Sequence, residues 1–392
     1  MGYKKLILKS GRERSLVNRH PWVFSGAVKV LPEAENGEII EIHTNHKELL
    51  GYGFFSPNSQ ITCRVFEFCD QEIELNEAYW IAKLQNAFGL RKNLFNPNET
   101  NCYRLLHAEG DFFPGIIVDV YNEVAVVQVL IRGVEQIAAV VYKGLNQLGF
   151  KYIYLKTKQT TQLLEQVEQG SRWVAESCPM PIEVLEHGVK FHVNVETGQK
   201  TGFFIDQREN RKLVAEWSKD KTVLNTFSYS GGFSVYALEA GASLVHSVDS
   251  SRDAIALCDA NIEKAGMQHK HQSFTEDCFD FLKAAGSDFY DIIILDPPAF
   301  AKNARSVANA ARGYQNLNFL GFHKIKKGGL LFTYSCSQHI DKDLFRKIVF
   351  SAAADAKRNV RILKQLSQPE DHPINIYHPE GEYLKGLMLL VD

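Results

Sequence analysis

The stretch Thr222-Val-Leu-Asn-Thr-Phe-Ser-Tyr-Ser-Gly-Gly-Phe-Ser-Val-Tyr-Ala-Leu-Glu-Ala-Gly241 decides the fold of this chain. The apolar, β-branched run 223–227 is typical of a buried strand. The helical spacing of Phe233, Tyr236 and Leu238 then predicts a helix that Gly241 closes. Between the two lies a small polar turn with two glycines. Backbone N–H groups of such a turn can approach a ligand closely, near the positive end of the helix.

An acidic residue follows at the expected distance for a nucleoside ligand. A second predicted strand, 244–249, ends in Asp249, seventeen residues after Gly232. In open α/β sheets ligands bind outside the carboxyl ends of the strands, where an acid can accept hydrogen bonds from both hydroxyls of a ribose. These residues predict a nucleoside-type cofactor. The alternative is an ordinary strand-to-helix turn with an exposed aspartate.

Composition narrows the class of protein. The chain has 392 residues, of which 45% are hydrophobic and 23% charged, so we expect a globular protein of two or three domains. It has no apolar run of 18 residues and no apolar signal core at its start, which predicts a cytoplasmic protein without a membrane partner. Seven scattered cysteines without a Cys-x-x-Cys pair suit a reducing compartment and predict neither disulfides nor a metal site.

The net charge of −2 is small, but its distribution is uneven. Residues 1–29 contain seven cations and one acid, Glu13. A local basic patch can bind phosphate even on a neutral protein, although a solvated surface is the alternative. The segment Arg19-His-Pro-Trp-Val-Phe24 also mixes cations with aromatics, as single-stranded RNA platforms do. Its aromatic rings could instead belong to a core.

The order of predicted elements indicates three regions. Residues 1–70 contain short strands typical of a small β-barrel, and residues 71–183 mix helices and strands as an α+β unit. Residues 184–392 alternate strands and helices, which predicts a doubly wound, mainly parallel sheet. Its expected strands are 223–227, 244–249, 271–275, 291–296 and 330–335, with 360–366 and 384–391 as an antiparallel pair. Its expected helices are 232–240, 252–265, 278–285, 303–326 and 346–356.

Two of these strands end in residues suited to chemistry. The apolar strand 291–296 ends in Asp296-Pro297-Pro298, a rigid loop whose carbonyls could bind a planar polar base. The next strand leads to Cys336, so both side chains should project from neighbouring carboxyl ends. A cysteine there can be a nucleophile, aided by His339 or Lys302, although a lone cysteine is more often a small buried hydrophobe.

A third segment suits the amino-acid end of S-adenosylmethionine (SAM). Asp206-Gln207-Arg208 opens a predicted helix after a tight loop with Gly198 and Gly202. Arg208 could bind a carboxylate in bidentate fashion, and Asp277, after the third strand, could receive an adenine amino group. The alternative for the first segment is a salt-bridged helix start.

Together these motifs resemble the ribosomal RNA large subunit methyltransferase I family over nearly the whole chain. The matching segments are Arg19 to Ala27, Lys200 to Arg208, Phe227 to Gly232, Asp296-Pro-Pro298, Arg312-Gly-Tyr314, Ser335-Cys-Ser337, His372-Pro373 and Leu384-Lys-Gly386. Two departures are Ala299, where relatives carry Lys, and the pair Gln338-His339.

The resemblance implies an architecture and a reaction. It implies a PUA-like RNA-binding domain at 1–70, an α+β (EEHEE) middle domain at 71–183 and a class I SAM-dependent methyltransferase domain at 184–392. The product would be 5-methylcytosine in 23S rRNA, with the thiolate of Cys336 adding to C6 of the base and Asp296 binding its N3/N4 edge. The partner would be 23S rRNA or a large-subunit precursor; a homodimer is left open.

The residues predicted to act fall into three groups. The catalytic group is Cys336, Asp296, Pro297 and Pro298. The SAM-binding group is Asp206, Gln207, Arg208, Asn225, Phe227, Ser228, Tyr229, Ser230, Gly231, Gly232, Asp249, Asp277 and Asp296. The RNA-binding group is Lys5, Arg12, Arg14, Arg19, His20 and Trp22. No metal ligand is predicted.

Three other functions stay open on the sequence. An amino-group methyltransferase would use Asp296-Pro-Pro without a thiol, but it usually has an aromatic residue directly after the prolines, and here Phe300 comes one residue late. A NAD-dependent oxidoreductase is disfavoured because Ser228 to Gly232 lacks the three-glycine spacing. A non-catalytic RNA-binding protein would have no need of an intact Asp296 and Cys336.

Overall fold

A computed structural model describes residues 2–157, 159–168, 170–301 and 303–392 of the protein. The chain divides into two compact units. Unit 1 comprises Met1–Val184, Val193–Phe203 and Glu370–Gly381, and unit 2 comprises Leu185–His192, Phe204–Pro369 and Glu382–Asp392. No helix of the described residues has the length and hydrophobicity needed to cross a membrane. The predicted boundaries at 70/71 and 183/184 stay a prediction.

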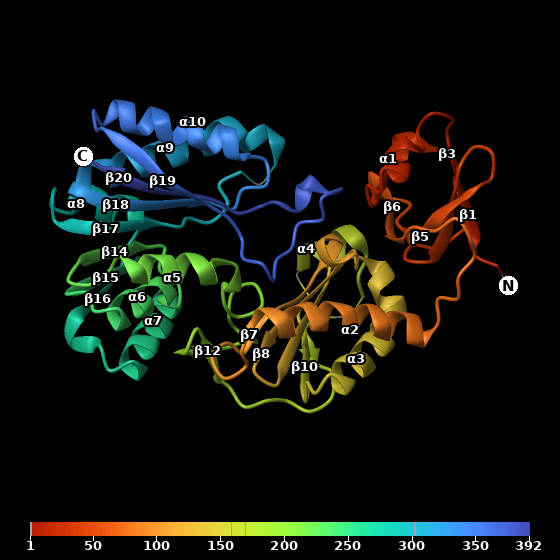
Figure 1. Ribbon diagram of the computed structural model, residues 1–392, viewed down its shortest axis with the longest axis horizontal. Helices are drawn as coiled ribbons and strands as arrows, with labels where there is room; N and C mark the ends of the chain where they lie inside the picture. The colour runs from red at the N-terminus through yellow and green to blue at the C-terminus, as the bar shows by residue number, and fades with distance from the viewer. Residues whose placement is uncertain (1, 158, 169, 302) are drawn as a thin grey trace. The chain divides into compact units, whose positions relative to one another are not determined.

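Unit 1 begins with a six-stranded sheet of order β2-β6-β5-β4-β1-β3 (Figure 1). Its elements are β1 (Lys4–Leu8), α1 (Arg14–Val17), β2 (Trp22–Phe24), β3 (Val28–Val30), β4 (Ile39–His43), β5 (Leu49–Phe55) and β6 (Ile61–Glu67). The four longer strands, β1, β4, β5 and β6, agree with the short strands predicted for residues 1–70. The strands β2 and β3 were missed because three residues are too few to show a period.

The rest of unit 1 is built on a five-stranded sheet, β11-β10-β9-β8-β7, with α2 and α3 packed together (Figure 1). Its elements are α2 (Glu77–Leu94), β7 (Cys102–His107), β8 (Ile116–Tyr121), β9 (Val124–Val129), α3 (Ala138–Gln147), β10 (Tyr152–Leu155), α4 (Gln159–Glu165) and β11 (Arg172–Trp173). A hairpin of β12 (Ile182–Glu186) and β13 (Val189–Val193) follows, and its residues Leu185–His192 belong to unit 2. The strand β7 was missed because charged Arg104 interrupts its apolar run.

Unit 2 contains the seven-stranded sheet β16-β15-β14-β17-β18-β20-β19. The first five strands are parallel, and β20 runs antiparallel to both its neighbours. The strands are β14 (Thr222–Thr226), β15 (Leu244–Asp249), β16 (His271–Thr275), β17 (Tyr290–Leu295), β18 (Ile325–Ser335), β19 (Val360–Leu366) and β20 (Lys385–Val391). This is the predicted doubly wound sheet.

Helices cover the sheet in two groups, α5-α6-α7 and α8-α9-α10 (Figure 1). They are α5 (Arg208–Glu216), α6 (Gly232–Glu239), α7 (Arg252–Lys264), α8 (Cys278–Ala284), α9 (Val307–Lys324) and α10 (Lys342–Asp355). The helix predicted at 346–356 in fact begins at Lys342. Its N-cap is Asp341, whose carboxylate accepts the Leu344 N–H at 2.7 Å, and this cap adds a polar first turn that hydrophobic spacing does not reveal.

Buried ion pairs hold unit 1 together. Asp119 is fully buried and accepts two hydrogen bonds from the Arg104 guanidinium, at 2.7 and 2.9 Å. Its carboxylate also accepts the hydroxyl of Thr201 at 2.6 Å. Removing one member of such a pair leaves the other charge buried without compensation.

We therefore expect Asp119→Ala to lower the free energy of unfolding by about 3–5 kcal/mol, since Arg104 loses its carboxylate in a buried site. Urea unfolding followed by circular dichroism would measure the loss. The control is Glu77→Ala, because the Glu77–Lys143 pair is exposed and should contribute less than about 1 kcal/mol. Equal losses in the two variants would contradict the expectation.

Candidate active site

The predicted turn lies at the carboxyl end of β14 and has an unusual backbone. Phe227 and Tyr229 adopt positive φ angles of 54° and 45°, and Gly231 has φ of 75°. Positive φ is costly for residues with a Cβ and persists where the surroundings hold it, often at functional sites. Here the Ser228 N–H donates to the Val248 carbonyl at 3.0 Å, which fastens the turn to the end of β15.

The two glycines of the turn are needed for packing. A Cβ on Gly231 would lie 2.5 Å from the Cys258 sulfur on α7, and one on Gly232 would lie 3.0 Å from the Arg211 side chain on α5. The sequence suggested close approach to a ligand as the reason for these glycines. The structure adds a second reason, which is that helices α6, α7 and α5 pack too closely here for a side chain.

Asp249 lies beside this turn, as predicted. Its carboxylate accepts the Tyr229 N–H at 3.0 Å with one oxygen and the Ser251 N–H at 2.9 Å with the other. Each oxygen retains lone pairs for a ribose hydroxyl. Two buried oxygens nearby, Ser228 Oγ and Asn225 Oδ1, have no hydrogen-bond partner within the described part of the chain. A polar ligand at the turn would satisfy buried groups of this kind, so the site fits a nucleoside cofactor.

The segment 206–208 is more buried than its sequence suggested. The Tyr383 hydroxyl donates to the Asp206 carboxylate at 2.8 Å, and the Asn210 amide donates to the Gln207 side chain at 2.6 Å. Arg208 is fully buried, and its Nε donates to Glu209 at 3.0 Å. The contact with Glu209 agrees with the predicted salt-bridged helix start. It also agrees with the other prediction, that Arg208 binds a carboxylate.

Sequence reasoning missed the neighbouring Arg211, which the Glu186 carboxylate holds in bidentate fashion at 2.7 and 2.6 Å. Asp277 also has a local function that the sequence prediction did not include. Its carboxylate caps α8 by accepting the Phe279 and Asp280 N–H groups at 2.9 and 3.2 Å. An adenine contact by Asp277 stays a prediction.

Asp296 and Cys336 follow directly on neighbouring parallel strands. The strand β17 ends at Leu295, β18 ends at Ser335, and Leu295 lies opposite Thr333. The structure thus brings both predicted catalytic side chains to one edge of the sheet. Cys336 is partly exposed, whereas Cys63, Cys102, Cys258 and Cys278 are buried. His339 is exposed, and Lys302 lies outside the described residues.

One buried hydroxyl, that of Ser337, ties the two loops together. It accepts the Ala301 N–H at 3.1 Å and shares a hydrogen bond of 2.9 Å with the Tyr314 hydroxyl on α9. Burial raises the pKa of Tyr314, so its phenol stays neutral. Gly313 leaves room for the Phe300 ring, which packs on Tyr314 with ring centres 4.5 Å apart. These contacts account for Gly313 and Tyr314 of the Arg312-Gly-Tyr motif and for Ser337 of the Ser-Cys-Ser motif.

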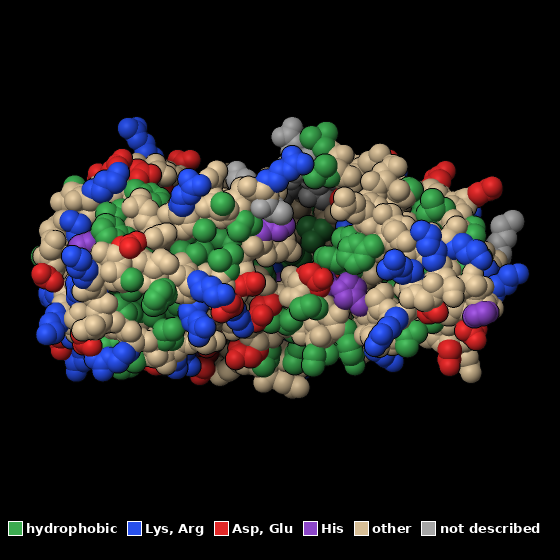
Figure 2. Space-filling view, turned by 90° about the horizontal axis from the view of Figure 1, so that it is seen from above, with side chains coloured by type: hydrophobic (Ala, Val, Ile, Leu, Met, Phe, Trp, Pro, Cys, Tyr) green, Lys and Arg blue, Asp and Glu red, His purple; other side chains and the backbone are tan. Residues whose placement is uncertain are grey.

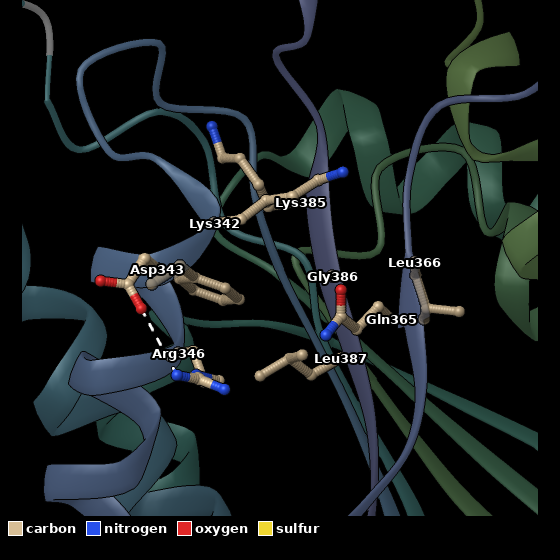
Figure 3. Close-up of a pocket in the computed structure, with 9 residues that line it drawn as sticks. Lys342, Asp343, Arg346, Gln365, Leu366, Lys385, Gly386 and Leu387 are labelled. Atoms are coloured by element: carbon tan, nitrogen blue, oxygen red, sulfur yellow. Dashed lines mark hydrogen bonds and ion pairs between the residues drawn. The ribbon is translucent and has the colours of Figure 1, made fainter.

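A lysine that the sequence prediction did not single out completes this edge. Lys385, the first residue of β20, is buried and lies opposite Ser335 in the register of β18 and β20. It also lines a pocket of about 250 Å³ formed with residues of α10 and β19, which include Lys342, Arg346 and Gln365 (Figure 3). The next residue must be Gly386, because a Cβ there would lie 2.5 Å from the Tyr334 ring.

The predicted RNA-binding residues lie in unit 1. Arg12, Arg14 and Arg19 are exposed, and Lys and Arg side chains face the viewer over the N-terminal sheet in Figure 2. Lys5 is also exposed and lies 3.7 Å from Glu41. Trp22 is half-buried, and its indole N–H donates to Glu109 at 2.8 Å. The core residue of this segment is Val23, while Phe24 is 47% exposed.

The sequence analysis did not predict where the segment Glu370–Gly381 packs. This segment connects β19 and β20 of unit 2, yet it belongs to unit 1. The Asp371 carboxylate accepts the Arg104 N–H, and its carbonyl accepts Arg91, each at 2.8 Å. His378 packs on Trp22 with ring centres 4.4 Å apart, and the centre of the His20 ring lies 5.8 Å from that of His378. The predicted RNA-binding residues His20 and Trp22 are thus backed by the C-terminal part of the chain.

Comparison with known proteins defines the class first. Residues 103–374 match the S-adenosylmethionine-dependent methyltransferase family model, and residues 6–68 match a PUA-like domain. Two solved structures cover 98% of this chain and are themselves covered to 99%, at 26% identity. One, from Streptococcus mutans, is described as a SAM-dependent methyltransferase and has a TM-score of 0.84. The other, with a TM-score of 0.83, is described as a methyltransferase complexed with SAH. The chain is a SAM-dependent methyltransferase with a PUA-like domain.

The curated relatives define the particular family. The ribosomal RNA large subunit methyltransferase I of Alteromonas mediterranea is 39% identical over 389 residues, with 98% of each chain covered. That of Aeromonas salmonicida is 38% identical with the same coverage. The chain belongs to the ribosomal RNA large subunit methyltransferase I family, and the predicted cofactor, SAM, is confirmed.

Asp249→Ala should weaken SAH binding by about 1–3 kcal/mol, because a carboxylate that can accept ribose hydroxyls is lost. Isothermal titration calorimetry measures this directly. The control is Asp253→Ala, an exposed acid in the first turn of α7, which should leave the affinity unchanged. An unchanged affinity in the Asp249 variant would remove that residue from the cofactor site.

Asp277→Ser separates a cofactor contact from a structural one. Serine is a good N-cap and should keep α8 intact, but it lacks the carboxylate that would receive an adenine amino group. If Asp277 contacts the adenine, SAH affinity should fall roughly three- to tenfold with the thermal midpoint preserved. Full affinity would leave the residue as a helix cap alone.

Proposed function

We propose that this protein methylates C5 of a cytosine in 23S rRNA, using SAM and a covalent adduct between Cys336 and C6 of the base. The observation that carries the proposal is the placement of a partly exposed cysteine and Asp296 at the carboxyl ends of neighbouring strands, tied by Ser337. The name of the relatives gives the RNA of the large ribosomal subunit as their substrate, which agrees with a PUA-like domain bearing exposed arginines.

The residues of the chain divide the chemistry between them. C5 of cytosine is a weak nucleophile, and addition of the Cys336 thiolate at C6 gives it enamine character. Asp296 binds the N3/N4 edge of the base by accepting a hydrogen bond from the N4 amino group and stabilises the adduct, while the Pro297-Pro298 loop holds the ring rigidly. When bound, SAM supplies the methyl group that C5 accepts, and this group is activated by its attachment to a positively charged sulfur. A base then removes the C5 proton, the C6–S bond breaks, and Cys336 leaves as a thiolate.

The cofactor would be held by the turn of residues 225–232, by Asp249 and by the segment 206–208. The RNA would be held by Lys5, Arg12, Arg14, Arg19, His20 and Trp22. The target base must leave its stack or lie in a loop to reach Cys336. Phe300 packs on Tyr314, so the aromatic residue that an amino-group methyltransferase would place next to its substrate is used for packing here.

We expect Cys336→Ala to abolish methylation and leave SAH affinity nearly unchanged, since the thiol acts on the base and not on the cofactor. RNA containing 5-fluorocytosine should trap the wild-type protein covalently, because elimination requires a C5 proton. Denaturing gels and peptide mass spectrometry would detect the adduct. The control is Cys178→Ala, which removes another partly exposed cysteine and should trap normally.

The outcome also decides between reactions. An amino-group methyltransferase would form no adduct and would retain most of its activity without Cys336. If another cysteine is trapped, the proposed C5 reaction stands but its nucleophile is that cysteine and not Cys336. Mapping the methylated nucleotide in rRNA from a deletion strain would identify the base.

Neutralising Arg14 and Arg19 to glutamine should weaken RNA binding and flatten its dependence on salt. Each lost phosphate contact lowers the slope of log K against log [salt] by roughly 0.7–0.9. Filter binding at several salt concentrations would measure the slope. Replacing Lys212 and Lys219, two exposed lysines of unit 2, with glutamine changes the net charge equally and should leave the slope unchanged. A slope unaffected by the arginine changes would place the RNA elsewhere.

A further inference from the structure

We propose that Lys385 positions the turn that carries Cys336 and that its ammonium stabilises the thiolate form of Cys336. The inference rests on the proposed function and names a residue that acts through the nucleophile. An ordinary cysteine has a pKa of about 8.5, so only a small fraction is thiolate at neutral pH. An enzyme that begins with thiolate addition therefore gains from a nearby positive charge.

Hydrogen bonds fix the position of this lysine. Lys385 Nζ donates to the carbonyl of Ser337 and to the carbonyl of Tyr383, each at 2.7 Å. The Ser337 carbonyl belongs to the residue that follows the nucleophile. An ammonium has three N–H donors, and these two bonds leave one for a further acceptor. Because Lys385 is only 3% exposed, water screens its charge weakly.

The start of β20 is itself held in place. The Gln368 side-chain oxygen accepts the Tyr383 and Leu384 N–H groups at 3.1 and 3.3 Å. The Tyr383 hydroxyl donates to Asp206 at 2.8 Å. The Tyr383 carbonyl that orients Lys385 therefore cannot move freely. A charged group held in advance costs little reorganisation when it acts on a reacting atom.

The surrounding charges show why a cation is needed here. Asp296, at the end of the neighbouring strand, carries a negative charge that opposes a thiolate on Cys336. The Tyr314 phenol of α9 is neutral. Asp341 and Lys342, at the start of α10, are an acid and a base next to each other in the sequence. Lys342 is ion-paired with Glu382. Arg211 is another buried cation in this unit, but its guanidinium is paired with Glu186. Lys385 is thus a buried cation that can offset the thiolate.

The acid–base behaviour of Lys385 agrees with this role. Burial lowers the pKa of Lys385 to about 8, and the Cys336 thiolate, Glu382 and Asp341 act in the opposite direction. The lysine is therefore mainly protonated at neutral pH and loses its charge as the pH rises through about 8. The proton released by Cys336 goes to solvent, and Lys385 keeps all three of its protons. The stabilisation of the thiolate is thus present at neutral pH and disappears in alkaline solution.

The test measures the reactivity of Cys336 without RNA. Wild-type protein is treated with iodoacetamide at pH 5.5–9.5, and the alkylation rate of the Cys336 peptide is followed by mass spectrometry. The variants are Lys385→Met, Lys385→Gln and Lys385→Arg, with SAH affinity as the check on folding. Glutamine retains an N–H donor but no charge, whereas arginine retains both. The control is Lys342→Met, which removes a lysine from the same pocket.

We expect the wild-type midpoint to lie below about 8.5, and the methionine and glutamine variants to raise it by about one pH unit. Their alkylation at pH 7 should be roughly tenfold slower, and arginine should restore most of the rate. A structural role alone would let glutamine restore the wild-type profile, which would overturn the inference. If both neutral variants lose SAH binding, a wild-type midpoint at or above 8.5 overturns it as well.

Trapping with 5-fluorocytosine RNA separates this inference from the proposed function. If the methionine variant is trapped normally and its alkylation profile is not shifted, the proposed role of Lys385 is wrong while the proposed C5 methylation stands. If the alkylation profile shifts in the neutral Lys385 variants but the wild-type protein is not trapped at all, the interaction of Lys385 with Cys336 is supported and the proposed C5 methylation is wrong.

Discussion

The hydroxyl of Ser337 is the contact on which the catalytic edge of the sheet depends. It is buried between two loops that leave neighbouring strands, and it binds the backbone of one loop at Ala301 and the helix α9 through Tyr314. Asp296 lies five residues before Ala301, and Cys336 lies directly before Ser337. A single hydrogen-bonded residue thus fixes the distance between an acid that would hold a base and a thiol that would attack it.

The same edge shows how backbone and charge are arranged before a ligand arrives. Phe227 and Tyr229 are held at positive φ, and Asp249 binds the Tyr229 N–H of that turn with one oxygen and the Ser251 N–H with the other. Buried polar oxygens remain at Ser228 and Asn225 without a partner among the residues described. Strained backbone and unsatisfied oxygens each cost stability, and the turn of residues 225–232 has both. Such a combination is expected at a site whose structure is adapted to binding.

Much of this arrangement could be predicted from the sequence, and the reason is the parallel sheet. Buried parallel strands appear as apolar runs, and their carboxyl ends must meet at one edge. The runs 291–296 and 330–335 therefore suffice to predict that Asp296 and Cys336 lie at the same edge of the sheet. The side chains that support them could not be predicted in this way. The contact of Ser337 with Tyr314 joins β18 to α9, and only packing decides which face of a helix is turned inward.

Functions that depend on register were also hidden in the sequence. Lys385 begins a strand of apolar residues, and an isolated lysine at such a position normally indicates an exposed strand end. It is buried because β20 runs antiparallel to β18, which sets Lys385 opposite Ser335. Asp277 is the converse case, since its position after a strand suggested a ligand contact while its carboxylate caps α8. Lys385 has its partner at a residue far away in the sequence, Ser337, whereas the partners of Asp277 are backbone N–H groups two and three residues further along the chain.

The connection between β19 and β20 contributes residues to both units. Its middle part, Glu370–Gly381, packs in unit 1, where His378 contacts Trp22, and four residues after Gly381 the chain reaches Lys385. The start of β20 is held by contacts of its own, because the Gln368 side chain accepts both N–H groups that precede Lys385 and Asp206 accepts the Tyr383 hydroxyl. The position of Lys385 is therefore fixed by contacts within unit 2.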